Sequence, residues 1–224
     1  MIKKLEVCSF NISDFNKIIK QKVSRIELCI NKEVGGLTPP EKDIAYAVSK
    51  NTPIHTIVRP RPGNFIYNTK ELRLMINSIK YCRDAGCKGV VFGILDNKNS
   101  IDYEKCRMLV KESKGMSLTF HMAFDLTEDP LDSMEKIIDL GFDRILTRGQ
   151  KQNAEDGISL INKLVDKSKK RISIMPGSGV RSSNIDLFLK NKNIKDFHSS
   201  CYINNSFSEM ELEKLIRTIK ENQN

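Results

Sequence analysis

The sequence predicts a single (β/α)₈ barrel, and three observations support this fold class. Short apolar runs with the composition of β-strands alternate with amphipathic helical patterns along the whole chain. Such an alternation is typical of parallel strands joined by right-handed helical crossovers. The 224 residues hold eight of these units. An open dinucleotide-binding sheet uses fewer units and has a glycine-rich first turn, which is missing here after Cys8. Eight units therefore favour closure into a barrel of the TIM type.

The expected strands are aliphatic, β-branched runs that end in polar residues or glycine. They cover residues 5–10, 25–29, 53–59, 89–93, 117–121, 144–148, 171–176 and 196–200. The helical patterns between them carry apolar residues three and four positions apart, as at Leu72, Ile76 and Ile79. We expect one helix after each strand.

Capping residues mark the ends of several expected helices. Pairs that favour a helix start precede the first, fifth and seventh helices, and these pairs are Ser13-Asp14, Asp129-Pro130 and Ser182-Ser183. Gly86 and Gly141 follow helical patterns, where a helix commonly ends in a left-handed residue. No linker rich in glycine, serine or proline interrupts the pattern, so we expect one domain over residues 1–224.

The N-terminal sequence predicts a cytoplasmic protein. Lys3 and Lys4 are not followed by the apolar run and cleavage site of a signal peptide. No run of ~18 apolar residues predicts a membrane-spanning helix, so we expect no membrane partner. Disulfides are rare in a reducing cytoplasm, and the six cysteines are therefore expected to be free thiols. Whether the barrel forms a homo-oligomer stays open.

The net charge of +9 raises the question of nucleic-acid binding. The lysines are scattered over the expected helices instead of forming one stripe. Their densest cluster, at residues 163–171, lies at a helix end, where basic groups interact favourably with the helix dipole. No aromatic residue that could stack on a base is interleaved with this cluster. We therefore do not expect nucleic acid as a partner.

Reactive side chains gather at the ends of the expected strands, which form the active-site face of a (β/α)₈ barrel. The candidate catalytic residues at this face are Glu27, His121, Asp125 and His198. Glu27 lies inside a strand, where a lone carboxylate would be costly to bury. It is therefore expected either to form a salt bridge with a cation such as Arg59 or to act as an acid or base. Asp125 is expected either to join the site or to cap the turn before the next helix.

Two loops carry groups that suit an anion. Arg59 and Arg61 lie among prolines that hold the loop extended, and guanidinium groups bind carboxylates and phosphates. Gly177 and Gly179 follow the seventh strand, where many barrels bind phosphate at a helix N-terminus. The alternatives are structural ion pairs for the arginines and a tight turn for the glycines. If these groups line one mouth, we expect a pocket of about 300–1,000 Å³.

Cys8 and Cys29 end two adjacent expected strands. Neighbouring strands lie about 4.8 Å apart, so two thiols that point inward at the same height converge. Two thiolates are a donor set for soft Cu(I), in contrast to the hard cations that carboxylates attract. The alternative is two buried cysteines that serve only as small apolar residues. Cys201, soon after His198, is a further thiol candidate.

Eight segments of the chain together resemble the CutC copper homeostasis family. They are LEVC (5–8), RIELC to EVGGLTP (25–39), VRPRPGNFIYN (58–68), GVVFGILD (89–96), LTFHMAFD (118–125), GFDRILTRGQ (141–150), ISIMPGSGV (172–180) and FHSS (197–200). The resemblance covers nearly the whole chain up to about residue 200. It implies a cytoplasmic TIM-type barrel with a role in copper handling, in which Cu(I) is bound by the two cysteines at positions 8 and 29.

Two positions depart from the family pattern. The family usually has arginine where this chain has Met122, and serine where it has Arg148. The resemblance therefore does not extend to an anion contact at these positions. Two functions remain, and they are compatible. One is copper homeostasis with Cu(I) as the bound ion, and the alternative is an enzyme that acts on a small anionic or phosphorylated substrate. In that enzyme Arg59 would hold the anion and His121 would move a proton.

Overall fold

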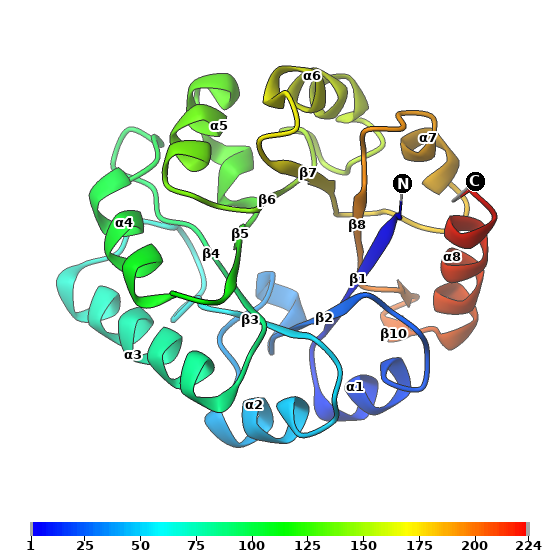
Figure 1. Cartoon of the computed structure of the whole chain (residues 1–224), viewed down its shortest axis with the longest axis horizontal. Coiled ribbons are helices and arrows are strands. Elements are labelled where there is room, and N and C mark those ends of the chain that lie inside the picture. The colour runs from blue at the N-terminus through cyan, green and yellow to red at the C-terminus, as the bar shows by residue number, and fades with distance from the viewer. Residues whose placement is uncertain (1, 223–224) are drawn as a thin grey trace.

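The computed structural model describes residues 2–222, in which eight parallel strands form an inner ring surrounded by helices (Figure 1). The strands are β1 (Lys4–Ser9), β2 (Arg25–Leu28), β3 (Ile54–Ile57), β4 (Gly89–Phe92), β5 (Ser117–Phe120), β6 (Arg144–Thr147), β7 (Ser173–Pro176) and β8 (Asp196–Ser199). The predicted TIM-type (β/α)₈ barrel is confirmed, and each predicted strand overlaps an observed one. Residues 1, 223 and 224 of the predicted domain lie outside the described residues.

The order of the strands around the barrel is sequential. Parallel ladders join β1 to β7 in chain order, and β8 pairs with β1. β7 and β8 lie side by side, and across this junction the Ser173 hydroxyl donates a hydrogen bond to Asp196 Oδ2 at 2.6 Å. The barrel is therefore nearly closed, as expected when right-handed βα units follow one another.

A helix follows each strand on the outside of the barrel. The helices are α1 (Ile12–Ile18), α2 (Glu41–Val48), α3 (Thr69–Ala85), α4 (Tyr103–Glu112), α5 (Pro130–Asp139), α6 (Ile158–Ser168), α7 (Ile185–Leu189) and α8 (Glu209–Glu221). The loops also hold two 3₁₀ turns, η1 (Lys32–Val34) and η2 (Met122–Leu126), and a hairpin of β9 (Tyr202–Ile203) and β10 (Ser206–Phe207). These short elements were not predicted. Within the described residues, no helix is long and apolar enough to cross a membrane.

Two of the predicted helix boundaries show how capping works here. The start of α5 at Asp129-Pro130 is confirmed, with Asp129 accepting hydrogen bonds from the first backbone N–H groups. The predicted start at Ser13-Asp14 is wrong, because the side chain of Asn11 accepts from the backbone N–H of residue 14 and so caps α1 earlier. Gly86 and Gly141 end α3 and α5 with φ of 97° and 86°, as predicted for left-handed positions.

The interior of the barrel is polar. Successive strand residues point alternately towards the helices and into the barrel. Leu5 and Val7 of β1 belong to the main apolar core, so Glu6 points inward between them. Its carboxylate forms an ion pair with Arg25 at 2.6 Å, and the same guanidinium contacts Asp196 Oδ1 at 2.8 Å. Buried charges of this kind are tolerated only when they are paired, and this network forms the base beneath the site.

Candidate functional site

A cavity of about 190 Å³ opens at the carboxyl ends of the strands. It has room for about six water molecules. The predicted pocket of drug-ligand size is therefore wrong, because large apolar side chains such as Phe10, Phe65 and Met122 form much of the wall. Six of the ten predicted site residues line this cavity, and they are Cys8, Glu27, Arg59, His121, Gly179 and His198.

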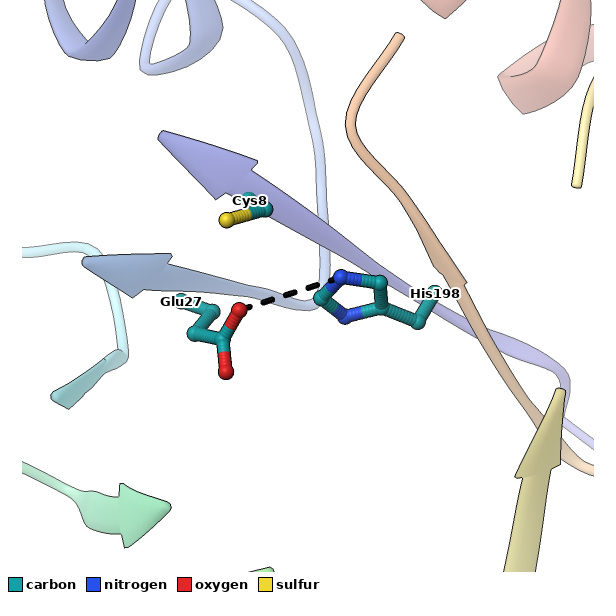
Figure 2. A group of neighbouring side chains, drawn as sticks. All are labelled: Cys8, Glu27 and His198. Atoms are coloured by element: carbon teal, nitrogen blue, oxygen red, sulfur yellow. Dashed lines mark ion pairs between the residues drawn. The ribbon is translucent and has the colours of Figure 1, made fainter. Parts of the chain in front are cut away.

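His198 lies at the floor of the cavity between two glutamates. The register of β8 against β1 places it beside Glu6, and the register of β1 against β2 places Cys8 beside Glu27. His198 Nδ1 lies 2.7 Å from Glu6 Oε1, and Nε2 lies 3.8 Å from Glu27 Oε2 (Figure 2). The predicted alternative in which Arg59 is the partner of Glu27 is therefore wrong, since the cation at Glu27 is His198.

The charges of this group are coupled. Burial lowers the pKa of His198, but the hydrogen bond to Glu6 and the charge of Glu27 outweigh burial and raise the pKa above its ordinary value. Burial raises the pKa of Glu6, but the Arg25 guanidinium and His198 hold it well below its usual range. Burial raises the pKa of Glu27, and the charge of His198 opposes this effect. The protonation of His198 therefore depends on the charges of both Glu6 and Glu27.

The thiols of Cys8 and Cys29 converge as predicted from their strand positions. Their sulfur atoms lie 2.8 Å apart, and Cys29 Sγ lies 3.3 Å from the carbonyl oxygen of Ser9. Cys8 lines the cavity, whereas Cys29 lies behind it and is covered by the loop at Gly36, whose φ of 91° suits glycine. Burial raises the pKa of both thiols, and for Cys8 the neighbouring Cys29 and Glu27 raise it further. Both thiols are therefore protonated at neutral pH.

Arg59 and His121 also line the cavity, and both lie against the Phe65 ring. The Arg59 guanidinium donates to the carbonyl oxygens of Val34, Gly36 and Gly63, and no carboxylate among the described residues pairs with it. It therefore holds two loops together and leaves a buried positive charge beside the cavity.

His121 is neutral, and only one of its ring nitrogens carries a proton. Its Nδ1 accepts a hydrogen bond from the backbone N–H of Ala123, so the proton of the neutral ring is on Nε2. Burial and the charge of Arg59 lower the pKa of His121 to about 3. Nε2 is buried without a hydrogen-bond partner in the described part of the chain. A neutral imidazole N–H of this kind is suited to donate to an oxygen atom of a ligand.

Asp125 does not line the cavity. Its carboxylate accepts hydrogen bonds from the Thr147 hydroxyl at 2.6 Å and from the backbone N–H groups of Arg148 and Gln150 at 3.0 and 2.8 Å. The Arg148 side chain lies 4.0 Å away. This geometry matches neither of the two predicted roles, because Asp125 lies in the 3₁₀ turn after β5 and its carboxylate holds the turn that follows β6.

Arg61 also lies outside the cavity. Its guanidinium pairs with Glu71 at 2.5 Å and donates to the carbonyl oxygens of Asn64 and Ile66. It stacks over the ring of Tyr67 at 5.1 Å. Arg61 therefore fixes the loop after β3 to the start of α3, which is the structural alternative considered for the arginines.

The glycines after β7 surround a tight turn. A Cβ atom at Gly177 would lie 2.4 Å from Leu146 Cδ1, so any larger residue there would displace the Leu146 side chain. Gly179 lines the cavity. The predicted helix start at Ser182-Ser183 is wrong, because α7 begins after Asn184. The Glu211 carboxylate accepts from the backbone N–H and the hydroxyl of Ser182, so these two donors are already bonded to a protein carboxylate.

Several site residues were missed in the sequence. Glu6, Arg25, His55 and Asp196 point into the barrel below the cavity and are all buried. The signal that identifies Glu6 is its separation of two residues from Cys8, which puts both on one face of β1. Cys201 lies near Ser199 and does not line the cavity.

Comparisons with known proteins agree with one another. The sequence profile of the CutC family matches residues 3–203. A CutC family protein of Pasteurella multocida is 39 % identical over 198 residues, which cover 88 % of this chain and 81 % of that protein. A CutC family protein of Bacteroides fragilis is 41 % identical over 197 residues, covering 87 % of this chain and 78 % of that protein.

Solved structures show the same relationship. The putative copper homeostasis protein CutC from Streptococcus agalactiae has a TM-score of 0.84 and 35 % identity, and the match covers 89 % of this chain and 99 % of that chain. KGPDC from Streptococcus mutans has a TM-score of 0.70 and 12 % identity over the full length of both chains, which shows a shared barrel fold alone.

Proposed function

The chain belongs to the CutC family, and from this premise we propose that it acts in copper homeostasis by binding Cu(I) through Cys8 and Cys29. The observation that supports this most directly is the distance of 2.8 Å between the two sulfur atoms. Thiolates are soft donors and select monovalent copper over hard cations. A reducing cytoplasm, which we propose as the location, keeps both thiols reduced.

Copper binding requires the two sulfur atoms to separate. Metal–thiolate bonds of about 2.3 Å place two sulfurs on opposite sides of one ion ~4.6 Å apart. The apolar residues that pack around the pair are Ile57, Val91 and the partly buried Phe10. A rotation of the Cys8 side chain towards the cavity, which this residue lines, is the direction in which space exists. The ion would then lie at the cavity floor and be shielded from water.

The experiment is an anaerobic titration with Cu(I) against a competing chelator. Wild-type protein is expected to bind one Cu(I) per chain, and the double variant Cys8→Ser/Cys29→Ser is expected to lose this binding. The matched control is Cys82→Ser/Cys106→Ser, which removes two other buried thiols and is expected to leave copper binding unchanged. Equal copper stoichiometry in the wild type and the Cys8/Cys29 variant would contradict the proposal.

A second candidate function is catalysis on a small anionic or phosphorylated substrate. The observation that favours it is that Arg59, a cation, and His121, a hydrogen-bond donor, line the same cavity as His198 and Glu27. In this candidate the His121 Nε2–H binds a substrate oxygen beside the charge of Arg59. Proton transfer would fall to His198 and Glu27, whose side chains lie 3.8 Å apart and line the same cavity.

The protonation state of His121 tests its role in this candidate. We expect its ring to stay neutral from pH 7 down to about pH 4, because the pKa is lowered to about 3. Nitrogen chemical shifts of the imidazole, measured by NMR at pH 7, 5.5 and 4.5, should therefore not change and should report a proton on Nε2. A titration of this ring near pH 6.5, the ordinary range of histidine, would instead support the role of a proton carrier.

A further inference from the structure

Three different donor atoms meet at the floor of the cavity. Cys8, Glu27 and His198 extend from β1, β2 and β8, which are neighbours in the barrel, and their side chains converge (Figure 2). The sulfur, a carboxylate oxygen and an imidazole nitrogen all lie within 4.8 Å of one another. In a tetrahedral zinc site with bonds of 2.0–2.3 Å, ligand atoms lie about 3.3–3.8 Å apart. The separation of 3.8 Å between His198 Nε2 and Glu27 Oε2 already meets this requirement.

We propose that Cys8, Glu27 and His198 form a site for a divalent ion of intermediate softness, with Zn²⁺ as the reference ion. One sulfur, one oxygen and one nitrogen are the ligand types that Zn²⁺ takes in proteins. Cu(I) prefers the two sulfurs instead, so the two metals use different sets of ligands that share Cys8. This inference is independent of the copper proposal, because it does not involve Cys29.

The orientation of His198 supports the site independently of the distances. Histidines that bind metals almost always donate the N–H of the other ring nitrogen to a carboxylate or carbonyl group. Here Nδ1 is bonded to Glu6 at 2.7 Å, which leaves Nε2 to face Cys8 and Glu27. Glu6 is itself fixed by Arg25 at 2.6 Å. The carboxylate and the guanidinium therefore hold the imidazole in the rotamer and tautomer that a metal ligand needs.

The site leaves one coordination position open. Cys8, Glu27 and His198 all line the cavity, whereas Cys29 does not. Three protein ligands with a fourth position open to a cavity are typical of catalytic zinc sites, while structural sites are closed by four. A bound ion would thus present a water molecule or an oxygen of a small ligand to the cavity. His121 also lines the cavity, and the N–H at its Nε2 would donate to that oxygen.

The test is Zn²⁺ affinity under reducing conditions, measured against a chromophoric chelator. The wild type is expected to bind one Zn²⁺ per chain. Glu27→Gln and His198→Asn are expected to lower the affinity at least 100-fold. In His198→Asn the side-chain amide still donates to Glu6, and the variant lacks only the Nε2 atom that would bind the metal. Glu6→Gln weakens the hydrogen bond that orients His198 and should lower the Zn²⁺ affinity 10- to 100-fold. Cys29→Ser should still bind one Zn²⁺ per chain, because Cys29 does not line the cavity.

Spectroscopy with Co²⁺ keeps the proposal testable if a variant does not fold. Co²⁺ bound to the wild type and to Cys29→Ser should show a thiolate-to-metal charge-transfer band, and Cys8→Ser should lack it. Absence of the band in the wild type would overturn the site, as would equal Zn²⁺ affinity in folded Glu27→Gln and His198→Asn. Loss of Zn²⁺ binding in Cys29→Ser would overturn the three-residue set. Failure of Cu(I) binding alone affects only the copper proposal.

Discussion

Replacing Arg25 with methionine is expected to lower the free energy of unfolding by about 3–5 kcal/mol. Arg25 lies inside the barrel and forms ion pairs with Glu6 at 2.6 Å and Asp196 at 2.8 Å. All three side chains are buried. Methionine matches the length of the aliphatic part of arginine, so the change removes the charge and its hydrogen bonds with little change of volume.

The size of this effect follows from what remains after the change. Glu6 is fully buried, and Arg25 is the strongest of the neighbouring charges that lower its pKa. Without the guanidinium, two carboxylates stay in the interior, and the cationic partners left within 4 Å of Glu6 among the described residues are His198 and the more distant His55. Breaking a buried ion pair by removing one partner costs more than the pair contributes, because an uncompensated charge is left in a medium of low dielectric constant.

Urea denaturation followed by circular dichroism measures the effect of Arg25→Met. The matched control is Arg107→Met, because Arg107 pairs with Glu104 on the surface, where the two side chains are 65 % and 70 % exposed. Exposed pairs contribute about 0–1 kcal/mol, so the control should unfold close to the wild-type midpoint. If both variants lost less than 1 kcal/mol, the interior network would not be a source of stability.

The fold could be predicted from local patterns because each βα unit repeats the same signals. Aliphatic runs such as 89–93 end in glycine or polar residues, and amphipathic helices of regular period follow them. Eight repeats then leave few topologies, and the sequential barrel is the one observed. The errors were confined to helix starts such as α1, where the neighbouring residues Asn11 and Ser13 are both good caps and local sequence does not decide between them.

The candidate site could be predicted only in part, because its position depends on strand order and its pairings on side-chain geometry. Cys8 and His198 were placed correctly by the rule that strand ends meet at one face. The pairing of Glu27 was not predicted correctly. Its partner His198 comes from β8, which becomes a near neighbour only when the barrel closes. The sequence offered Arg59 as a partner for Glu27, but the Arg59 guanidinium instead donates to the carbonyl groups of two loops. No local pattern encodes that contact.

Replacing Asp125 with alanine is expected to lower the free energy of unfolding by about 2–4 kcal/mol. The carboxylate satisfies the Thr147 hydroxyl and the backbone N–H groups of Arg148 and Gln150 in a buried turn. Each buried donor left without an acceptor costs about 1–3 kcal/mol. Burial raises the pKa of Asp125, and these hydrogen bonds only partly oppose it, so burying the carboxylate has a cost. Alanine has no charge to bury, which offsets part of the loss of stability. The turn after β6 should also become more mobile.

Three variants distinguish a structural Asp125 from a functional one. Asp125→Asn keeps one acceptor oxygen and should lose less stability than Asp125→Ala. The control Asp132→Ala removes an exposed carboxylate paired with Lys136 on α5 and should unfold within about 0.5 kcal/mol of the wild type. Because Asp125 does not line the cavity, folded Asp125→Ala should bind Cu(I) and Zn²⁺ as the wild type does. A stable Asp125→Ala that fails to bind either ion would contradict this structural role, and it would place the carboxylate in the functional site.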